Sequence, residues 1–376
     1  MCDIEKGYAI CETSDAEEKY PVVDLRSDTL TKPTRNMRLA MLDAVVGDDV
    51  YEEDPTVKKL EETAARLTGK EAALFVTSGT MGNLISVMVH CDVRGSEVYC
   101  GEEYHVFLHE QGGAAQLGGV TLCTLPNNPD GSFDLTKLMS KFRKDRLHEP
   151  ISKLVIVENT NNGKIVPQEW IEQLAEMAKA RDLKLHLDGA RIWNAAVASK
   201  KLVKDLVSPF DSVTFCLSKG LGAPIGSLLC GSQYFVRKAR RIRKVLGGGM
   251  RQVGIIAAAG LIALEEIVPL LRFDHERAAF IAREINLLNS PTFYVDETLV
   301  QTNMIFINIR SKSISSADFT RRLREVHDDA NEDKVIIRCL ALSSTTVRFV
   351  LYHEINDEMV DMVRGKLRHV ITRMDV

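Results

Sequence analysis

Three short apolar runs, spaced about 30 residues apart, limit what this chain can fold into more than any other feature of its sequence. They cover residues 154–157, 183–187 and 213–217. Helical periodicity, as over residues 169–181, fills the intervals between them. Apolar strands that alternate with helices at this spacing are what repeated βαβ units produce. The sequence therefore predicts an α/β fold, with a mostly parallel sheet flanked by helices.

Each apolar run leads into a charged residue, in turn Glu158, Asp188 and Lys219. In a parallel sheet the carboxyl ends of the strands meet at one edge, where ligands bind. Lys219 precedes a segment with two glycines, Gly220 and Gly222, which let the backbone approach a ligand closely. A lysine at a strand end beside apolar surface can have a lowered pKa and form a Schiff base, and a solvated turn lysine is the alternative.

Asp188 is a carboxylate at the end of a run apolar enough to be buried, where an unpaired charge is costly. Taken alone, it could simply cap a turn. Together with Lys219, about 30 residues later, it predicts a site for pyridoxal 5′-phosphate, because that ring needs a carboxylate at its pyridine nitrogen.

Two further segments could meet an anion. Ser78, Gly79 and Thr80 follow an apolar run and open an apolar helix, where free N–H groups and hydroxyls can hold a phosphate. An ordinary helix cap is the alternative. Lys244 and Arg251 flank three consecutive glycines, which predicts a second anion-binding surface, with a hinge between lobes as the alternative.

The pattern along the chain predicts a flexible extension over residues 1–20, an N-terminal segment and large domain over 21–270, and a small C-terminal α/β domain over 271–376. In the small domain we expect helices at 274–288, 317–326 and 358–373. We expect its strands at 303–309, 335–339 and 347–352.

Composition narrows the class of function. The net charge of -4, from 48 basic and 52 acidic residues, offers no basic surplus for nucleic acid or an anionic membrane. The longest apolar stretch, near residues 254–259, is too short to span a bilayer. Eight cysteines without CxxC spacing, and an N-terminus without the apolar run of a signal peptide, predict a cytoplasmic protein with reduced thiols and no metal site.

Six sequence blocks, in this order and spacing, resemble the signatures of the threonine aldolase family of fold-type I pyridoxal-phosphate enzymes. They lie at residues 24–29, 47–51, 78–80, 188–191, 218–222 and 247–252. The resemblance runs from about residue 23 to residue 370. It implies the fold-type I architecture, with a large domain that binds the cofactor and a smaller C-terminal domain.

The resemblance implies a role for each matching residue. Lys219 would hold the cofactor as a Schiff base, and Asp188 would pair with its pyridine nitrogen. The 78–80 loop would bind its phosphate. His105 would stack over its ring and assist proton transfer, although by itself it could be a partly buried histidine with satisfied hydrogen bonds.

The resemblance also implies a substrate site and an assembly. Ser27, Arg191 and Arg348 would grip the α-carboxylate of an amino acid, with Arg191 also beside the cofactor. Lys244 and Arg251 would reach across a subunit interface towards the neighbour's cofactor phosphate. We therefore expect a homo-oligomer with shared active sites, at least a dimer and at fullest a tetramer.

The implied reaction is the cleavage of L-threonine or L-allo-threonine to glycine and acetaldehyde. The alternatives are another fold-type I reaction, such as β-elimination or transamination, and a non-catalytic relative that only binds the cofactor.

The chain departs from the family at one site position. Asn161 stands where family members carry a histidine that is associated with the β-hydroxyl of the substrate. We expect Asn161 to affect the preference between the two β-epimers, and stabilisation of a polar loop is the alternative.

Overall fold

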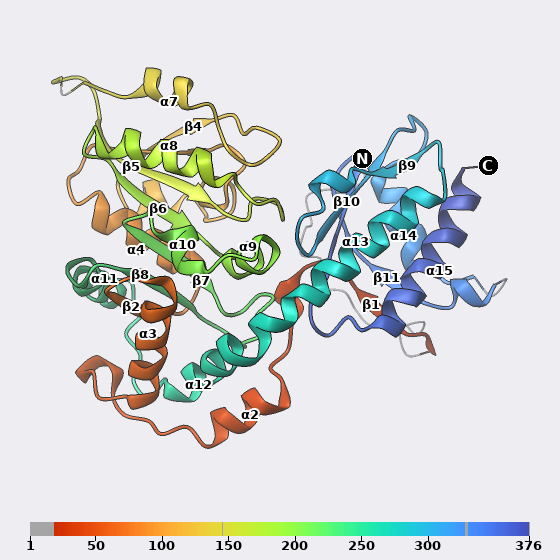
Figure 1. The fold of residues 1–376 in the computed structure, drawn as a ribbon, viewed down its shortest axis with the longest axis horizontal. Helices are drawn as coiled ribbons and strands as arrows, with labels where there is room; N and C mark the ends of the chain where they lie inside the picture. Colours follow the sequence, from red (N-terminus) through yellow and green to blue (C-terminus); the bar gives the residue numbers. More distant parts are fainter. Residues whose placement is uncertain (1–18, 145, 328–329, 376) are drawn as a thin grey trace.

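The computed structural model describes residues 19–144, 146–327 and 330–375, and the chain forms two lobes joined by the long helix α13 (Leu271–Leu287) (Figure 1). Most of the predicted extension, residues 1–18, lies outside the described residues.

The large lobe is built on a seven-stranded sheet in the order β2-β8-β7-β6-β5-β3-β4. The strands are β2 (Ala72–Val76), β3 (Ser96–Gly101), β4 (Thr121–Leu125), β5 (Ile151–Glu158), β6 (Lys184–Asp188), β7 (Ser212–Cys216) and β8 (Ser227–Gly231). Only β8 runs against its neighbours, since its pairings with β2 and β7 are antiparallel. The prediction of a mostly parallel sheet with flanking helices is confirmed.

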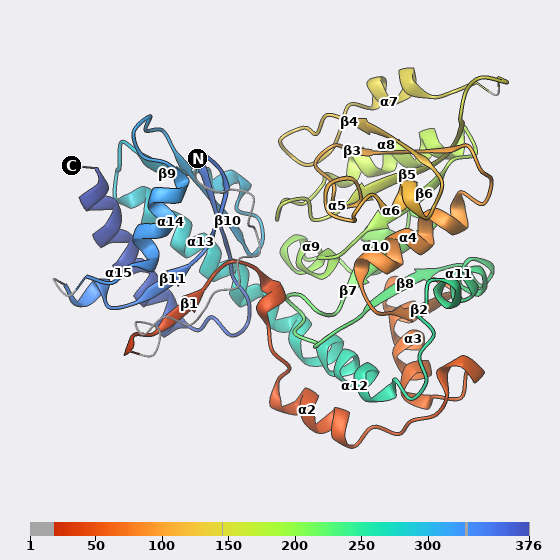
Figure 2. The same cartoon turned by 180° about the vertical axis from the view of Figure 1, so that it is seen from behind.

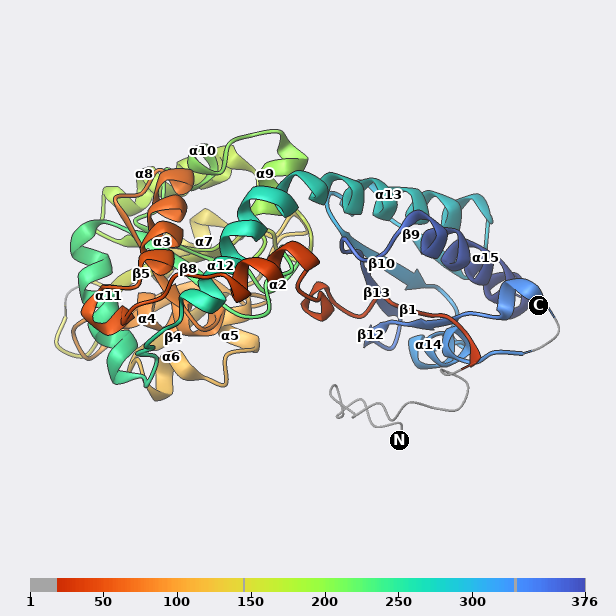
Figure 3. The same ribbon diagram turned by 90° about the horizontal axis from the view of Figure 1, so that it is seen from below.

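The helices of this lobe cover both faces of the sheet. Figure 3 separates α8 and α10 on one side from α4 and α6 on the other, and Figure 2 shows the lobe from behind the view of Figure 1. The helices are α2 (Arg35–Leu42), α3 (Pro55–Thr68), α4 (Gly79–His90), α5 (His105–Leu108), α6 (Gly113–Gln116), α7 (Leu135–Lys141), α8 (Gln168–Lys179), α9 (Ile192–Ser199), α10 (Val203–Val207), α11 (Gln233–Val245) and α12 (Gly254–Ile262).

The small lobe holds a four-stranded antiparallel sheet in the order β12-β13-β10-β9. Its strands are β9 (Phe293–Val295), β10 (Met304–Ile309), β12 (Leu340–Ser343) and β13 (Thr346–Val350). Helices α13 and α14 (Ser316–Arg324) pack on it, and α15 (Asp357–Met374) packs on these two helices.

The N-terminal segment belongs to this small lobe at its start. Strand β1 (Val22–Asp24) pairs in parallel with β11 (Ile336–Arg338), and Figure 3 shows it among the C-terminal elements. The prediction had grouped residues 21–270 together. The structure differs because Val22 and Val23 pair with Ile336 and Ile337, more than 300 residues further along the chain.

The helical run over residues 254–287 is the one helix in the described part of the chain that is long and apolar enough to cross a membrane. This differs from the sequence-based expectation that the apolar stretch near residues 254–259 is too short to span a bilayer. Half of its most apolar window is already buried, and α12 packs against α2 and α3, as a core helix does.

Candidate active site

The carboxyl ends of β5, β6 and β7 bring Glu158, Asp188 and Lys219 to one edge of the sheet, on the side towards the small lobe (Figure 1). Glu158 and Asp188 are register partners, and Lys219 follows β7 after two residues. Asp188 is 3% exposed. Its Oδ1 accepts a hydrogen bond from the Ala190 N–H at 3.1 Å, and its Oδ2 accepts one from Asn83 Nδ2 at 2.7 Å.

His105 begins the short helix α5 at the same edge. Its Nδ1 lies 2.9 Å from Glu110 Oε1, and its backbone N–H donates to Glu158 Oε2 at 2.6 Å. The hydrogen bond to Glu110 raises the pKa of His105, with the charge of Asp188 adding to the effect and burial opposing it. His105 is therefore biased towards its protonated form.

Glu158 was singled out from the sequence only by its position, but its environment is unusual. Burial, together with the negative charge of Asp188, raises the pKa of Glu158 to about 7. A carboxyl that titrates near neutral pH at a strand end can exchange a proton under physiological conditions.

The 78–80 loop has the shape of an anion cradle. Ser78 caps α4 by accepting a hydrogen bond from the Met81 N–H at 3.1 Å, and the first-turn N–H groups of a helix have no partner within that helix. A Cβ added to Gly79 would lie 2.9 Å from Cys216 Sγ. The loop can lie this close to β7 only because position 79 is a glycine.

Arg191 has an anionic partner within the chain that the sequence did not reveal. Its Nε donates to Asp28 Oδ2 at 2.7 Å, and its Nη2 donates to Asp28 Oδ1. Asp28 is fully buried, and although burial raises its pKa, Arg191 and then Lys219 hold it below the ordinary value. Asp28 thus occupies the Nε and Nη2 groups of the Arg191 guanidinium.

Arg348, on β13, lies in the opposite situation. Its Nη2 donates to the Arg26 carbonyl at 3.1 Å, but its buried Nε has no acceptor among the described residues. Burial, reinforced by the positive charge of Arg191, lowers the pKa of Arg348. Ser27 lies one residue beyond Arg26, where its Oγ accepts from the Thr29 N–H at 3.2 Å. Arg348 is therefore a partly buried cation whose Nε lacks an acceptor.

Asn161 is fully buried rather than open to a ligand. Its Nδ2 donates to Glu158 Oε1 at 3.2 Å, and its side chain packs so tightly on Gly131 that a Cβ there would lie 2.8 Å away. In the described structure its Oδ1 has no hydrogen-bond partner. The Asn161 amide group is therefore linked to the edge of the sheet through Glu158.

Lys244 and Arg251 are both exposed on the large lobe. Arg251 pairs with Asp48 at 2.8 Å, and the Lys244 side chain lies against Gly249. Gly248 packs on Met81 in the first turn of α4, so the glycine segment borders the 78–80 loop of its own chain. Whether the two cations also reach a neighbouring subunit stays a prediction.

Sequence reasoning missed Asn83, Glu110 and Asp28. Each is a buried polar residue whose partners are distant in sequence or on another element. One signal was available for Asn83, because a lone amide in the apolar helix α4 must find buried partners.

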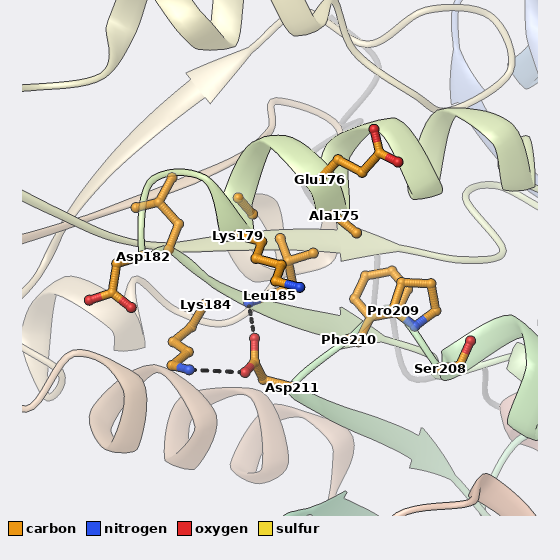
Figure 4. Close-up of a pocket in the computed structure, with 12 residues that line it drawn as sticks. Ala175, Glu176, Lys179, Asp182, Lys184, Leu185, Ser208, Pro209, Phe210 and Asp211 are labelled. Atoms are coloured by element: carbon orange, nitrogen blue, oxygen red, sulfur yellow. Dashed lines mark hydrogen bonds and ion pairs between the residues drawn. The ribbon is translucent and has the colours of Figure 1, made fainter.

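A hollow of about 460 Å³ lies at the other end of the central strands (Figure 4). Lys184 and Asp211 form an ion pair there at 3.1 Å, and Asp211 also accepts from the Leu185 N–H. These residues start β6 and precede β7, so the hollow is at the edge of the sheet opposite Asp188.

Residues 24–310 match the family of beta-eliminating lyases. The chain is 46% identical to low-specificity L-threonine aldolase 1 of Arabidopsis thaliana, over 89% of this chain and 92% of that one. It is 40% identical to the low specificity L-threonine aldolase of Escherichia coli K12, over 94% and 100% of the two chains. The fold is similar to that of a threonine aldolase from Leishmania major, with a TM-score of 0.75 and 19% identity, over 95% of this chain and all of that one.

Proposed function

The chain belongs to the beta-eliminating lyase family, together with the low-specificity L-threonine aldolases that it resembles, and from this premise we propose that it cleaves L-threonine and L-allo-threonine to glycine and acetaldehyde with pyridoxal 5′-phosphate as cofactor. The observation that carries this proposal is the shared sheet edge of Lys219 and Asp188, beside a glycine cradle.

The residues at this edge fit the cofactor. Asp188 is a buried carboxylate for the ring nitrogen, and Lys219 is the amine at the same edge. The 78–80 loop offers backbone donors to a phosphate, and any side chain at Gly79 would collide with Cys216.

When bound, the cofactor supplies a ring that accepts the electrons of the broken bond. Arg348, with its unpaired buried Nε, would bind the α-carboxylate of the substrate, helped by Ser27. Fixing the carboxylate fixes the rotation about N–Cα and so selects the bond that breaks. His105 keeps Nδ1 on Glu110, so Nε2 of the neutral ring can accept the proton of the β-hydroxyl, and the protonated ring can return it.

The rival reactions differ in their products. β-Elimination would release ammonia and a keto acid, and transamination would leave the amino group on the cofactor. The intact Lys219, Asp188 and Arg348 speak against a relative that only binds the cofactor. Acetaldehyde and glycine, formed in equal amounts from L-threonine, would distinguish the aldolase reaction from all three rivals.

We infer that the protein assembles as a homo-oligomer, at least a dimer and in its full form a tetramer. Several large apolar side chains are highly exposed in the single chain: Leu42 at 79%, Val45 at 69%, Tyr51 at 72% and Val245 at 76%. Such an exposed surface, close to Lys244 and Arg251, supports burial against a second copy. Sedimentation analysis would measure the assembly, and mixed oligomers of Lys219→Ala and Arg251→Ala chains should recover part of the activity if the site is shared.

A cytoplasmic location and a role in forming glycine complete the proposal. The six cysteines of the described residues are all free, as a reducing compartment would leave them. Fractionation of cells, followed by detection of the protein, would test the location.

The central experiment compares Lys219→Ala with Lys201→Ala, which removes an exposed lysine elsewhere on the large lobe. We expect Lys219→Ala to lose both turnover and the visible absorption of the bound cofactor, and Lys201→Ala to keep both. A cofactor adduct that borohydride still traps on the Lys219→Ala chain would show that another lysine holds the cofactor.

A further inference from the structure

One amide at the active site joins two carboxylates. Asn83 lies on α4 and is 1% exposed. Its Nδ2 donates to Asp188 Oδ2 at 2.7 Å and to Glu110 Oε1 at 2.8 Å. Its Oδ1 lies 3.1 Å from His186 Nε2. The amide therefore uses both of its N–H groups and its oxygen on buried partners.

The chemistry of these partners allows only one orientation of the Asn83 amide. A carboxylate can accept but not donate, so the two anions must face the NH2 group. The oxygen then faces His186, which must carry its proton on Nε2. Turning the amide around would place its oxygen against two carboxylates and leave the NH2 group without an anion.

The same order of donors and acceptors continues along α4 to the opposite edge of the sheet. His186 Nδ1, left as an acceptor, lies 2.8 Å from Ser212 Oγ, which lies 2.8 Å from His90 Nε2. Burial lowers the pKa of His186 well below its ordinary value and that of His90 to about 4, so both rings are neutral near pH 7. A relay of donors thus points from the start of β7 to Asp188.

Glu110, the second carboxylate that Asn83 holds, contacts His105. The Glu110 oxygen that accepts from Asn83 is the one that bonds His105 Nδ1. One atom each from His105, Glu110 and Asp188 lie within 4.8 Å of one another. The partner of the ring nitrogen and the partner of the acid–base histidine are therefore held by the same side chain.

We propose that Asn83 is a positioning residue that sets both groups at once: it keeps Asp188 aligned as an anion for the ring nitrogen of the cofactor, and it keeps Glu110 aligned for His105. This inference rests on the proposed function, because it takes the cofactor's ring nitrogen to face Asp188. Asn83 itself touches neither substrate nor cofactor in this account.

The test measures cofactor affinity for two ligands, pyridoxal 5′-phosphate and its 1-deaza analogue, whose ring carries carbon in place of the nitrogen. Asn83→Leu should weaken binding of pyridoxal 5′-phosphate by roughly ten- to a hundredfold, as expected for a lost hydrogen bond to a charged group. It should change binding of the deaza analogue by less than about twofold, because that ring makes no bond to Asp188.

Two further variants keep the test decisive. Asn83→Asp has the shape of the native residue and serves if Asn83→Leu does not fold; its affinity for pyridoxal 5′-phosphate should fall as pH rises, since an ionised Asp cannot donate. Asn286→Leu is the matched control, because Asn286 also bonds a carboxylate, that of Glu297, but in the small lobe. It should leave both affinities unchanged.

A second readout follows the His105 side. Glu110→Gln weakens the hydrogen bond that raises the pKa of His105 and removes the charge of Glu110, so the limb of the kcat/KM profile that reports His105 should move to lower pH. The preference for pyridoxal 5′-phosphate over the deaza analogue should stay unchanged in this variant.

The outcomes separate the two levels of the argument. Equal loss of affinity for both ligands in the Asn83 variants would show that Asn83 only maintains the fold, and would overturn the inference. A wild-type protein that binds neither ligand would instead refute the proposed function.

Discussion

A buried polar cluster around Asp333 in the small lobe and the cluster of Asp188, Glu110 and Glu158 in the large lobe are balanced in opposite ways. In the small lobe, Asp333 is fully buried and pairs with Lys366 Nζ at 2.5 Å and with Arg322 Nη1 at 3.0 Å. In the large lobe, Asp188 and Glu110 share one neutral amide, and Glu110 also bonds His105 Nδ1. Glu158 receives a backbone N–H and the Asn161 amide.

The pKa values follow this balance. Although burial raises the pKa of Asp333, its hydrogen bonds to Arg322 and Lys366 hold it below the ordinary value. Burial raises the pKa of Glu110, and it raises that of Glu158 to about 7. A cluster whose charges cancel within the chain stabilises the fold, whereas a cluster left rich in anions is suited to hold a cationic ligand such as a protonated ring.

The sharpest way to break this comparison is to neutralise one aspartate in each cluster. Asp333→Asn should lower the free energy of unfolding by about 3–5 kcal/mol, because it leaves Lys366 buried without its counter-charge. Its cofactor affinity should stay as in the wild type. Denaturant unfolding and cofactor titration would measure both quantities.

Asp188→Asn should do the reverse. We expect cofactor binding and turnover to be lost, with the stability of the cofactor-free protein changed by less than about 1 kcal/mol, since one of several repelling carboxylates is removed. If Asp188→Asn destabilised the protein as much as Asp333→Asn, the two clusters would not differ in kind.

The two clusters also mark what the sequence could and could not reveal. The central strands were predicted because each is a continuous apolar run at a regular spacing, and Asp188 and Lys219 share an edge because parallel strands end together. In the small lobe β12 was missed, since its four residues are mostly exposed and carry no apolar alternation.

Pairings between distant residues were beyond prediction. Arg191 was expected to bind the substrate carboxylate beside the cofactor, and its bond to Asp28, 163 residues away, was not foreseen. The bond from Asn83 to Asp188 spans 105 residues. Spacing shows which strands end together but not which side chains meet there, because that depends on how helices pack over the edge.

A substitution of Arg348 tests whether this partly buried cation of the small lobe, whose Nε lacks an acceptor, belongs to the site. Arg348→Lys keeps the charge but cannot form a two-pronged bond to a carboxylate. We expect a loss of about 1.5–3 kcal/mol in transition-state stabilisation, which lowers kcat/KM roughly ten- to a hundredfold or somewhat more. Arg277→Lys, the same exchange at a residue paired with Asp357, should leave the kinetics unchanged. Wild-type kinetics in Arg348→Lys would assign Arg348 to structure.

Glu158 allows the comparison to be sharpened by pH. Its folded pKa of about 7 lies above the ordinary value of 4.5, so the folded protein holds this proton longer than the unfolded chain. The corresponding stability is complete below about pH 4.5 and is lost as pH rises through about 7. Glu158→Gln should lack this loss.

The measurement is the melting temperature of the cofactor-free protein between pH 4.5 and 8. As pH rises, the melting temperature of Glu158→Gln should increase relative to that of the wild type by a few degrees. The same exchange at the exposed Glu172 should give a constant difference. A constant difference for Glu158→Gln as well would mean that Glu158 is ionised throughout this range.

Asn161 gives the smallest expected effect. The sequence suggested that this residue discriminates between the β-epimers, but the structure buries it completely and directs its Nδ2 to Glu158 at 3.2 Å. A group that acts through Glu158 cannot sense which way the substrate's methyl group points. We therefore expect Asn161→Ala to lower kcat/KM for L-threonine and L-allo-threonine by the same factor, about two- to tenfold for one lost neutral hydrogen bond.

Asn161→His should also affect both epimers alike, because the imidazole must occupy the slot between Glu158 and Gly131. Kinetics with both substrates, at full cofactor occupancy, would measure the ratio. A several-fold change in that ratio in Asn161→His would mean that the new ring leaves the slot and contacts the substrate, so that position 161 does read the β-carbon directly.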